Sequence, residues 1–250
     1  MNVEEYLNKL KAIKLDKSDN QVDKILQMLE ENVNFAFARF NDGEMMGIDK
    51  IGAKVARGDQ IVNESLHKAL KESIQYKQEN YYVGIPCSIC FPRYYQLAKS
   101  LVKQPEKFQL NAVALTNRNW KKFILKFPET IKGKKVLWIS GKDQNIEPLR
   151  KMGIDVSYQL TFNSKNSWGQ YNKLRFDFEN LLGIEYDIVI ISLGPAARVF
   201  VREYFEKIPN KTFIDIGSTF DPFTRNVWHN CHKGWIETGF NLTKSCKVCN

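Results

Sequence analysis

Apolar positions follow two different spacings along this chain. In residues 1–32 they recur every three or four positions, which predicts two amphipathic helices. Further on, short continuous apolar runs alternate with segments of helical spacing, and such runs are typical of strands buried on both faces of a parallel sheet. The predicted strands cover residues 35–40, 81–85, 111–115, 135–140, 156–161, 187–193 and 212–216. The predicted helices cover residues 63–77, 92–102, 119–127, 146–152, 171–182 and 196–207, and residues 45–63 are predicted as a loop.

This alternation of strands and helices predicts an α/β fold of the Rossmann-like kind. The sheet should be mostly parallel, with helices on both of its faces. A chain of 250 residues without repeats or linker-like composition fits one domain, 1–250. Within it, residues 1–32 form a helical N-terminal segment, and residues 225–250 form an irregular tail that contains cysteine and histidine.

Polar residues and glycines follow several of the predicted strands. In a parallel sheet of this kind, ligands bind beyond the carboxyl ends of the strands. The same residue types also serve ordinary turns, so their common location supports the fold more than any single site. They are Asp42 and Glu44, Thr116 and Asn117, Gly141 and Asp143, Gly194 and Arg198, and Gly217 and Ser218.

The segment Arg39–Glu44 carries the most distinctive chemistry of the chain. If it is extended, Asp42 and Glu44 point to the same side and converge on one divalent cation. Gly43 lets another group approach the backbone closely, and Arg39 lies on the same side, where it meets an anion. A metal ion flanked by an arginine suits a diphosphate. The alternative is a solvated acidic turn.

Residues 37–44, Phe-Ala-Arg-Phe-Asn-Asp-Gly-Glu, resemble the R-F/Y-G-D-G-E signature of the GT-D-type glycosyltransferases, a family once catalogued as a domain of unknown function. Asn41 stands where that signature usually has glycine. Residues 136–141, 188–195 and 213–217 are similar to the same family, so the resemblance covers most of the chain. It implies a nucleotide-sugar donor and a divalent metal, Mn²⁺ or Mg²⁺, held by Asp42 and Glu44.

Two further carboxylates are candidates for the general base that an inverting transfer would need. Asp215 is a polar residue inside an apolar strand, and a buried carboxylate is either hydrogen-bonded or functional. The family resemblance places its motif close to the donor pocket. Asp221 precedes Pro222, and ordinary turn chemistry is the alternative for it. The predicted catalytic residues are therefore Asp42, Glu44, Asp215 and Asp221.

Residues 192–198 predict a strand, a glycine turn and the start of a helix. Free N–H groups at such a start bind phosphate, and Arg198 adds charge, although similar turns also serve plain packing. The Asn117 side chain suits a sugar hydroxyl or a nucleobase, or it caps a helix. The chain contains neither a G-x-G-x-x-G fingerprint nor a P-loop, which disfavours NAD-dependent redox chemistry and P-loop phosphoryl transfer. The residues predicted to contact the donor are Arg39, Asn41, Gly43, Asn117, Gly194, Arg198 and Gly217.

The net charge of +9 indicates an acidic partner. A phosphorylated substrate, an anionic membrane surface in peripheral contact, or nucleic acid would fit it. The lysines are dispersed rather than gathered in one basic tract, so we expect no nucleic-acid partner. The sequence has no apolar run of membrane-spanning length and no secretion signal, which predicts a cytoplasmic protein.

Five cysteines in a chain without a secretion signal argue against a disulfide framework. Cys87 and Cys90 form a C-x-x-C between two prolines, which favours a loop over a redox helix. Near the end, Cys231, His232, Cys246 and Cys249 provide ligands for a structural Zn²⁺, and ordinary reduced thiols are the alternative.

Together these features predict a metal-dependent glycosyltransferase of the hexosyltransferase type. On resemblance alone the donor is a UDP-sugar, and the acceptor is a hydroxyl of a glycan or a glycosylated protein. Two alternatives remain at this point. One is a nucleic-acid-associated binding module with a zinc-binding tail, and the other is a hydrolase of nucleotide-diphosphate sugars that uses the same metal pair with water as the acceptor.

Overall fold

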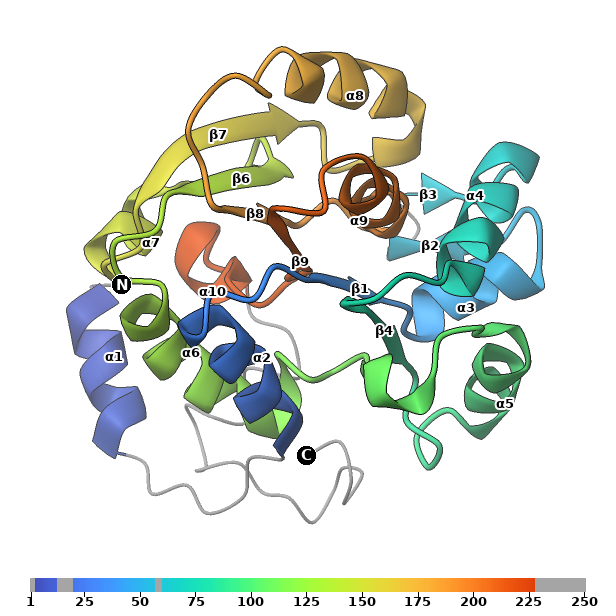
Figure 1. Ribbon diagram of the computed structural model, residues 1–250, viewed down its shortest axis with the longest axis horizontal. Coiled ribbons are helices and arrows are strands. Elements are labelled where there is room, and N and C mark those ends of the chain that lie inside the picture. The colour runs from blue at the N-terminus through green and yellow to red at the C-terminus, as the bar shows by residue number, and fades with distance from the viewer. Residues whose placement is uncertain (1–2, 13–19, 57–59, 228–250) are drawn as a thin grey trace.

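The computed structural model describes residues 3–12, 20–56 and 60–227. Its centre is a sheet of seven parallel strands in the order β5-β4-β1-β9-β8-β6-β7 (Figure 1). The prediction of a parallel α/β fold is confirmed. The strands are β1 (Ala36–Arg39), β4 (Tyr81–Ile85), β5 (Gln109–Asn111), β6 (Val136–Gly141), β7 (Val156–Phe162), β8 (Ile188–Ile191) and β9 (Thr212–Asp215).

Helices cover both faces of this sheet (Figure 1). On one face lie α3 (Asp42–Asp49), α4 (Glu64–Gln75), α5 (Pro92–Leu101), α8 (Tyr171–Glu179) and α9 (Ala196–Lys207). On the other lie α1 (Val3–Ala12), α2 (Asn20–Glu30), α6 (Trp120–Thr130), α7 (Glu147–Lys151) and α10 (Asp221–Thr224). None of the helices in the described ranges is both long and apolar enough to cross a lipid bilayer.

Strand β1 shows why its sequence is apolar throughout. Ala36 and Ala38 join the core under α9, whereas Phe35 and Phe37 join the core under α2 and α6. Successive side chains of a strand point to opposite faces, and here both faces are buried. The continuous apolar run therefore reflects a central strand of a three-layer molecule.

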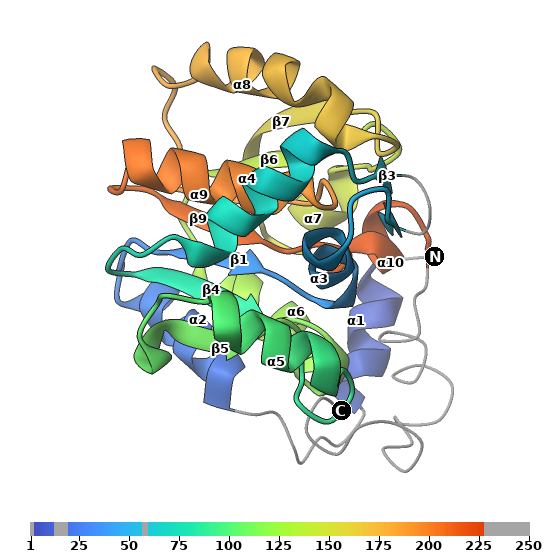
Figure 2. The same cartoon turned by 90° about the vertical axis from the view of Figure 1, so that its right-hand side faces the viewer.

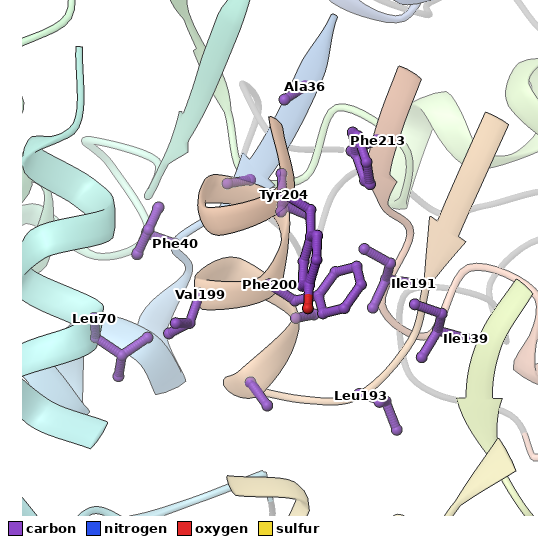
Figure 3. Packing of buried hydrophobic residues seen from close by; sticks show 14 of the residues in the cluster. Ala36, Phe40, Leu70, Ile139, Ile191, Leu193, Val199, Phe200, Tyr204 and Phe213 are labelled. Atoms are coloured by element: carbon purple, nitrogen blue, oxygen red, sulfur yellow. The ribbon is translucent and has the colours of Figure 1, made fainter. Parts of the chain in front are cut away.

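Helix α9 packs over the middle of the sheet (Figure 3). Phe200 and Tyr204 lie one turn apart, with ring centroids 4.4 Å from each other, and both contact Phe178 of α8. Phe200 also lies 6.5 Å from the Phe213 ring of β9. This aromatic cluster fixes the helix that carries Arg198 against the strand that carries Asp215.

The predicted loop 45–63 is wrong in two places. Helix α3 occupies its first part, and a short hairpin of β2 (Lys54–Val55) and β3 (Gln60–Ile61) follows. The predicted strand 111–115 is also displaced, because β5 ends at Asn111. The Asn111 side chain accepts a hydrogen bond from the Val113 N–H at 3.0 Å, and a turn of this kind ends a strand.

Candidate active site

The candidate site lies at the carboxyl edge of the sheet, between β1 and β9. The chain runs from β1 outward through β4 to β5, then crosses to the other side of the sheet and returns inward to β9 beside β1. The strand order thus reverses between β1 and β9, which is where open α/β sheets leave a crevice for ligands. Arg39 ends β1 and Asp215 ends β9, so the predicted site residues reach this position from two neighbouring strands.

The acidic motif after β1 opens a helix instead of continuing the strand. Helix α3 begins at Asp42, with Asn41 as its N-cap residue in an extended conformation. Oε2 of Glu44 accepts a hydrogen bond from the Asn41 N–H at 3.1 Å, one half of a capping box. An asparagine followed three residues later by a glutamate is the sequence signature of a capping box, so this helix start could have been predicted from the sequence.

This helix corrects the expected geometry of the two carboxylates. Residues two apart in a helix differ in direction by about 200°, so Asp42 and Glu44 do not share a face as they would in a strand. Glu44 is buried, whereas Asp42 is half-buried and makes no ion pair or hydrogen bond within the described residues. Gly43 between them has open space where a Cβ would stand.

Four buried charged residues form a compact cluster beside α3. Nε of Arg198 lies 3.0 Å from Oδ2 of Asp215, and its Nη2 lies 3.3 Å from Oε1 of Glu44. Nη2 of Arg39 lies 3.6 Å from Oδ1 of Asp215. Two guanidinium groups thus balance two carboxylates, which a buried charge requires if it is to remain ionised.

The two arginines of this cluster differ in how completely they are bonded. Arg198 also donates from Nε to the Arg39 carbonyl at 2.6 Å and from Nη1 to the Gly194 carbonyl, so each of its nitrogens has a partner. Arg39 has long contacts only, 3.5 Å to the Ala112 carbonyl and 3.6 Å to Asp215. Its Nε is buried and has no partner in the described part of the chain. The Arg39 guanidinium therefore has N–H donors that are not fully used within the described residues.

Gly217 makes room for the Arg39 side chain. A Cβ at this position would stand 1.7 Å from Nη2 of Arg39, and the residue has a φ of +49°. The Gly217 N–H also donates to Oδ1 of Asp215 at 3.0 Å. Glycine is thus needed at this strand end because a guanidinium group approaches the backbone closely. Contact of Gly217 with a donor stays a prediction.

Asp215 is fully buried, and both of its carboxylate oxygens are engaged. Oδ2 accepts from the Arg39 N–H at 3.3 Å and meets Arg198, while Oδ1 meets Gly217 and Arg39. Through these contacts Asp215 holds the end of β1, the Gly217 turn and the two arginine side chains together. The role of general base for Asp215 stays a prediction.

Asp221 lies in the first turn of α10 and pairs with a different arginine. Its Oδ2 is 3.0 Å from Nη2 of Arg225, and Nη1 of Arg225 is 2.9 Å from Oδ2 of Asp143. Burial raises the pKa of Asp143, but the Ser164 hydroxyl and the Arg225 guanidinium outweigh it and leave that pKa below its usual value. Sequence reasoning did not anticipate Arg225, whose only signal is its place in the segment after Asp221.

The remaining predicted residues line other strand ends. Asn117 starts a short 3₁₀ turn, Asn117–Asn119, with a φ of +52°. Gly194 precedes α9 with the same φ, and its carbonyl accepts from Arg198. Cys87 is buried and Cys90 is exposed in the turn after β4. Contacts of Asn117 and Gly194 with a donor stay predictions.

No group of three or more histidine, cysteine, aspartate or glutamate side chains within the described ranges could hold a metal ion. A divalent cation at Asp42 would thus need oxygen ligands from a substrate and from water, as Mg²⁺ commonly has. Residues Cys231, His232, Cys246 and Cys249, predicted to bind zinc, lie outside the described residues, so that site stays a prediction.

Comparisons with known proteins identify the fold. No protein-family model matches the chain, and a search of curated proteins finds no match. Among solved structures, a selenomethionine-substituted domain of unknown function 1792 is 19% identical, covers 96% of this chain and 94% of its own, and superposes with a TM-score of 0.64.

Two more solved structures of this kind are similar to the chain. One is described as a domain of unknown function 1792 with a distinct glycosyltransferase fold, at 18% identity, 96% and 94% coverage and a TM-score of 0.65. The other is a new glycosyltransferase of this type from Streptococcus sanguinis, at 14% identity, 91% and 94% coverage and a TM-score of 0.65. The chain therefore has the glycosyltransferase fold of these structures.

Proposed function

We propose that this protein is a glycosyltransferase that depends on a divalent metal and takes its sugar from a nucleotide diphosphate, with UDP as the expected nucleotide. The observation that carries the proposal is the position of Asp42. Its carboxylate has no partner in the described chain, and Asp42 begins the helix that follows β1 directly, at the carboxyl edge where the strand order reverses between β1 and β9. The glycosyltransferase fold supports the same assignment.

The residues at this edge fit a metal–diphosphate group. Asp42 would hold Mn²⁺ or Mg²⁺ on the open side of α3, with Glu44 next to it in the chain. The metal, when bound, supplies positive charge that stabilises the departing diphosphate. Arg39 adds a guanidinium that is bonded only weakly within the protein, and an arginine donates to phosphate in a planar, charge-assisted geometry. Because its Nε is buried, this contact would require the side chain to shift toward the diphosphate.

The first turn of α3 also favours an anion at this place. The N–H groups of this turn are the positive ends of peptide dipoles, and the turn begins at Asp42, just beyond the end of β1. The net charge of +9 attracts a nucleotide diphosphate from solution. The acceptor is a hydroxyl of a glycan or a glycosylated protein, and a hexose is the transferred sugar that we expect.

Substitution of Asp42 tests the proposal. D42N should abolish Mn²⁺-stimulated release of UDP from a UDP-sugar, because the amide cannot replace the carboxylate charge at the metal. D49N is the matched control, since Asp49 ends the same helix and pairs with the exposed Arg93. If D42N turns over the donor as fast as D49N does, Asp42 does not hold the metal and the proposal fails.

The acceptor decides between a transferase and a hydrolase that uses the same residues. UDP release should increase at least about tenfold when a glycan acceptor is added, because a transferase is built to place a hydroxyl rather than water at the sugar. Equal release with and without every acceptor tested would identify the hydrolase instead.

A further inference from the structure

The buried pair of Glu44 and Arg198 joins α3 to the rest of the site. Both side chains are at most one-tenth exposed, and they meet at 3.3 Å. Arg198 reaches Asp215 of β9, the Arg39 carbonyl at the end of β1, and the Gly194 carbonyl before its own helix. One guanidinium group thus bonds to α3, to the ends of β1 and β9, and to the turn before α9.

Glu44 has little capacity left for a metal ion. Its Oε1 faces Arg198, and its Oε2 accepts the Asn41 N–H of the helix cap. Asp42, one helical position away from the cap, is half-buried and has neither kind of contact within the described residues. The same helix therefore carries one carboxylate that is bonded to the protein and one that is not.

We propose that Glu44 and Arg198 are positioning residues, and that Asp42 alone of the two motif carboxylates contacts the metal. This inference rests on the proposed function. The ion pair holds the first turn of α3 against β9 and α9, and so fixes the direction of the Asp42 carboxylate. An arginine is required because its planar fork bonds four partners at once, which a lysine ammonium at the end of a flexible chain cannot do in the same geometry.

These roles can be separated by measuring Mn²⁺ binding to the full-length protein in the presence of UDP. The electron paramagnetic resonance signal of free Mn²⁺ decreases as the ion binds. D42N should remove binding. E44Q and R198K should each weaken it by about 10–100-fold, the usual loss when a residue that orients a metal ligand is changed. R202K is the matched control, because Arg202 lies one turn further along α9, is half-buried and pairs with the exposed Glu206, and this variant should bind Mn²⁺ as the unchanged protein does.

The double variant E44Q/R198K tests whether the pair acts as a unit. If both residues serve one contact, the double variant should bind Mn²⁺ no more weakly than the weaker single variant, because the contact can be lost only once. Raised Mn²⁺ should restore UDP release in E44Q and R198K but not in D42N.

Two results would overturn the inference while leaving the proposed function intact. One is an E44Q variant that loses Mn²⁺ as completely as D42N while R198K binds normally, since Glu44 would then be a ligand. The other is a double variant whose loss equals the product of the single losses. Normal Mn²⁺ binding by D42N would instead refute the proposed function itself. Thermal unfolding of each variant confirms that the measured protein is folded.

Discussion

Gly217 shows how a single missing side chain shapes the candidate site. The space that its Cβ would occupy contains Nη2 of Arg39, whose side chain is buried against Asp215. Elsewhere a flexible arginine would move aside. Here movement would separate Arg39 from the fully buried Asp215, and a buried carboxylate that loses a partner is costly.

We expect G217A to lower the free energy of unfolding by about 3 kcal/mol or more, which combines a left-handed backbone with a disturbed buried ion pair. G133A is the control, because Gly133 has a φ of +83° and open space at its Cβ position, so it bears the backbone cost of about 1–2 kcal/mol alone. Urea unfolding measures both. Equal losses in the two variants would show that the Arg39 contact contributes nothing.

At the scale of elements, α3 packs against α4 on one face of the sheet (Figure 2). Nδ1 of His67 in α4 lies 2.9 Å from the Gly47 carbonyl of α3, and Leu66 and Leu70 pack in the same core as Met45. The start of α4 is fixed by Asn63, whose side chain accepts from the Leu66 N–H at 2.9 Å. The Asn63 cap thus fixes the start of α4, and α4 in turn packs against α3, the helix that carries Asp42.

N63A should destabilise the protein by about 1 kcal/mol, because the first turn of α4 loses the acceptor for an otherwise unpaired N–H group. N63D should keep most of the stability, since aspartate caps a helix as well as asparagine does. The midpoint of urea unfolding at pH 7 distinguishes the two. A loss of the same size in both variants would contradict a capping role for Asn63.

At the scale of the whole molecule, the N-terminal helices belong to the core beneath the sheet. Tyr6 and Leu10 of α1 and Ile25 of α2 are buried in the same cluster as Phe37 of β1. Helix α2 packs along α6, which lies over the sheet on that face (Figure 1). Helices α1 and α2 are thus held to the sheet by apolar packing, and we expect them to unfold together with it.

I25A should cost about 2–5 kcal/mol if that expectation holds, since Ile25 is fully buried and its truncation leaves a cavity. I61A makes the same chemical change at an isoleucine that is 57% exposed, and it should change stability by less than about 0.5 kcal/mol. Urea unfolding followed by fluorescence and by circular dichroism should show one transition. An I25A variant as stable as I61A would place α2 outside the cooperative unit.

Local sequence determined much of this fold. Apolar runs located the strands, and β4 and α9 have the bounds that their patterns predicted. Strand period and helix period depend on neighbouring residues, which is why they can be recognised without the structure. The cap at Asn63 was recognisable for the same reason, because its hydrogen bond spans three residues.

The apolar pattern failed where a short helix has no clear amphipathic period. Helix α3 contains two glycines and buries only part of one side, so its apolar pattern resembled a loop. The Asn41–Glu44 capping signature was present, but the strand before it favoured an extended interpretation of Asp42 and Glu44.

The sequence by itself determined a parallel α/β molecule with an acidic motif and several arginines near strand ends, because these are properties of short segments. The tertiary structure alone decided that Arg198 bonds to Glu44, 154 positions earlier in the numbering, and that Arg39 lies over Gly217. Such contacts follow from the order of strands in the sheet, which no local pattern encodes. These contacts distinguish Glu44, whose carboxylate is bonded to the protein, from Asp42, whose carboxylate has no partner within the described residues.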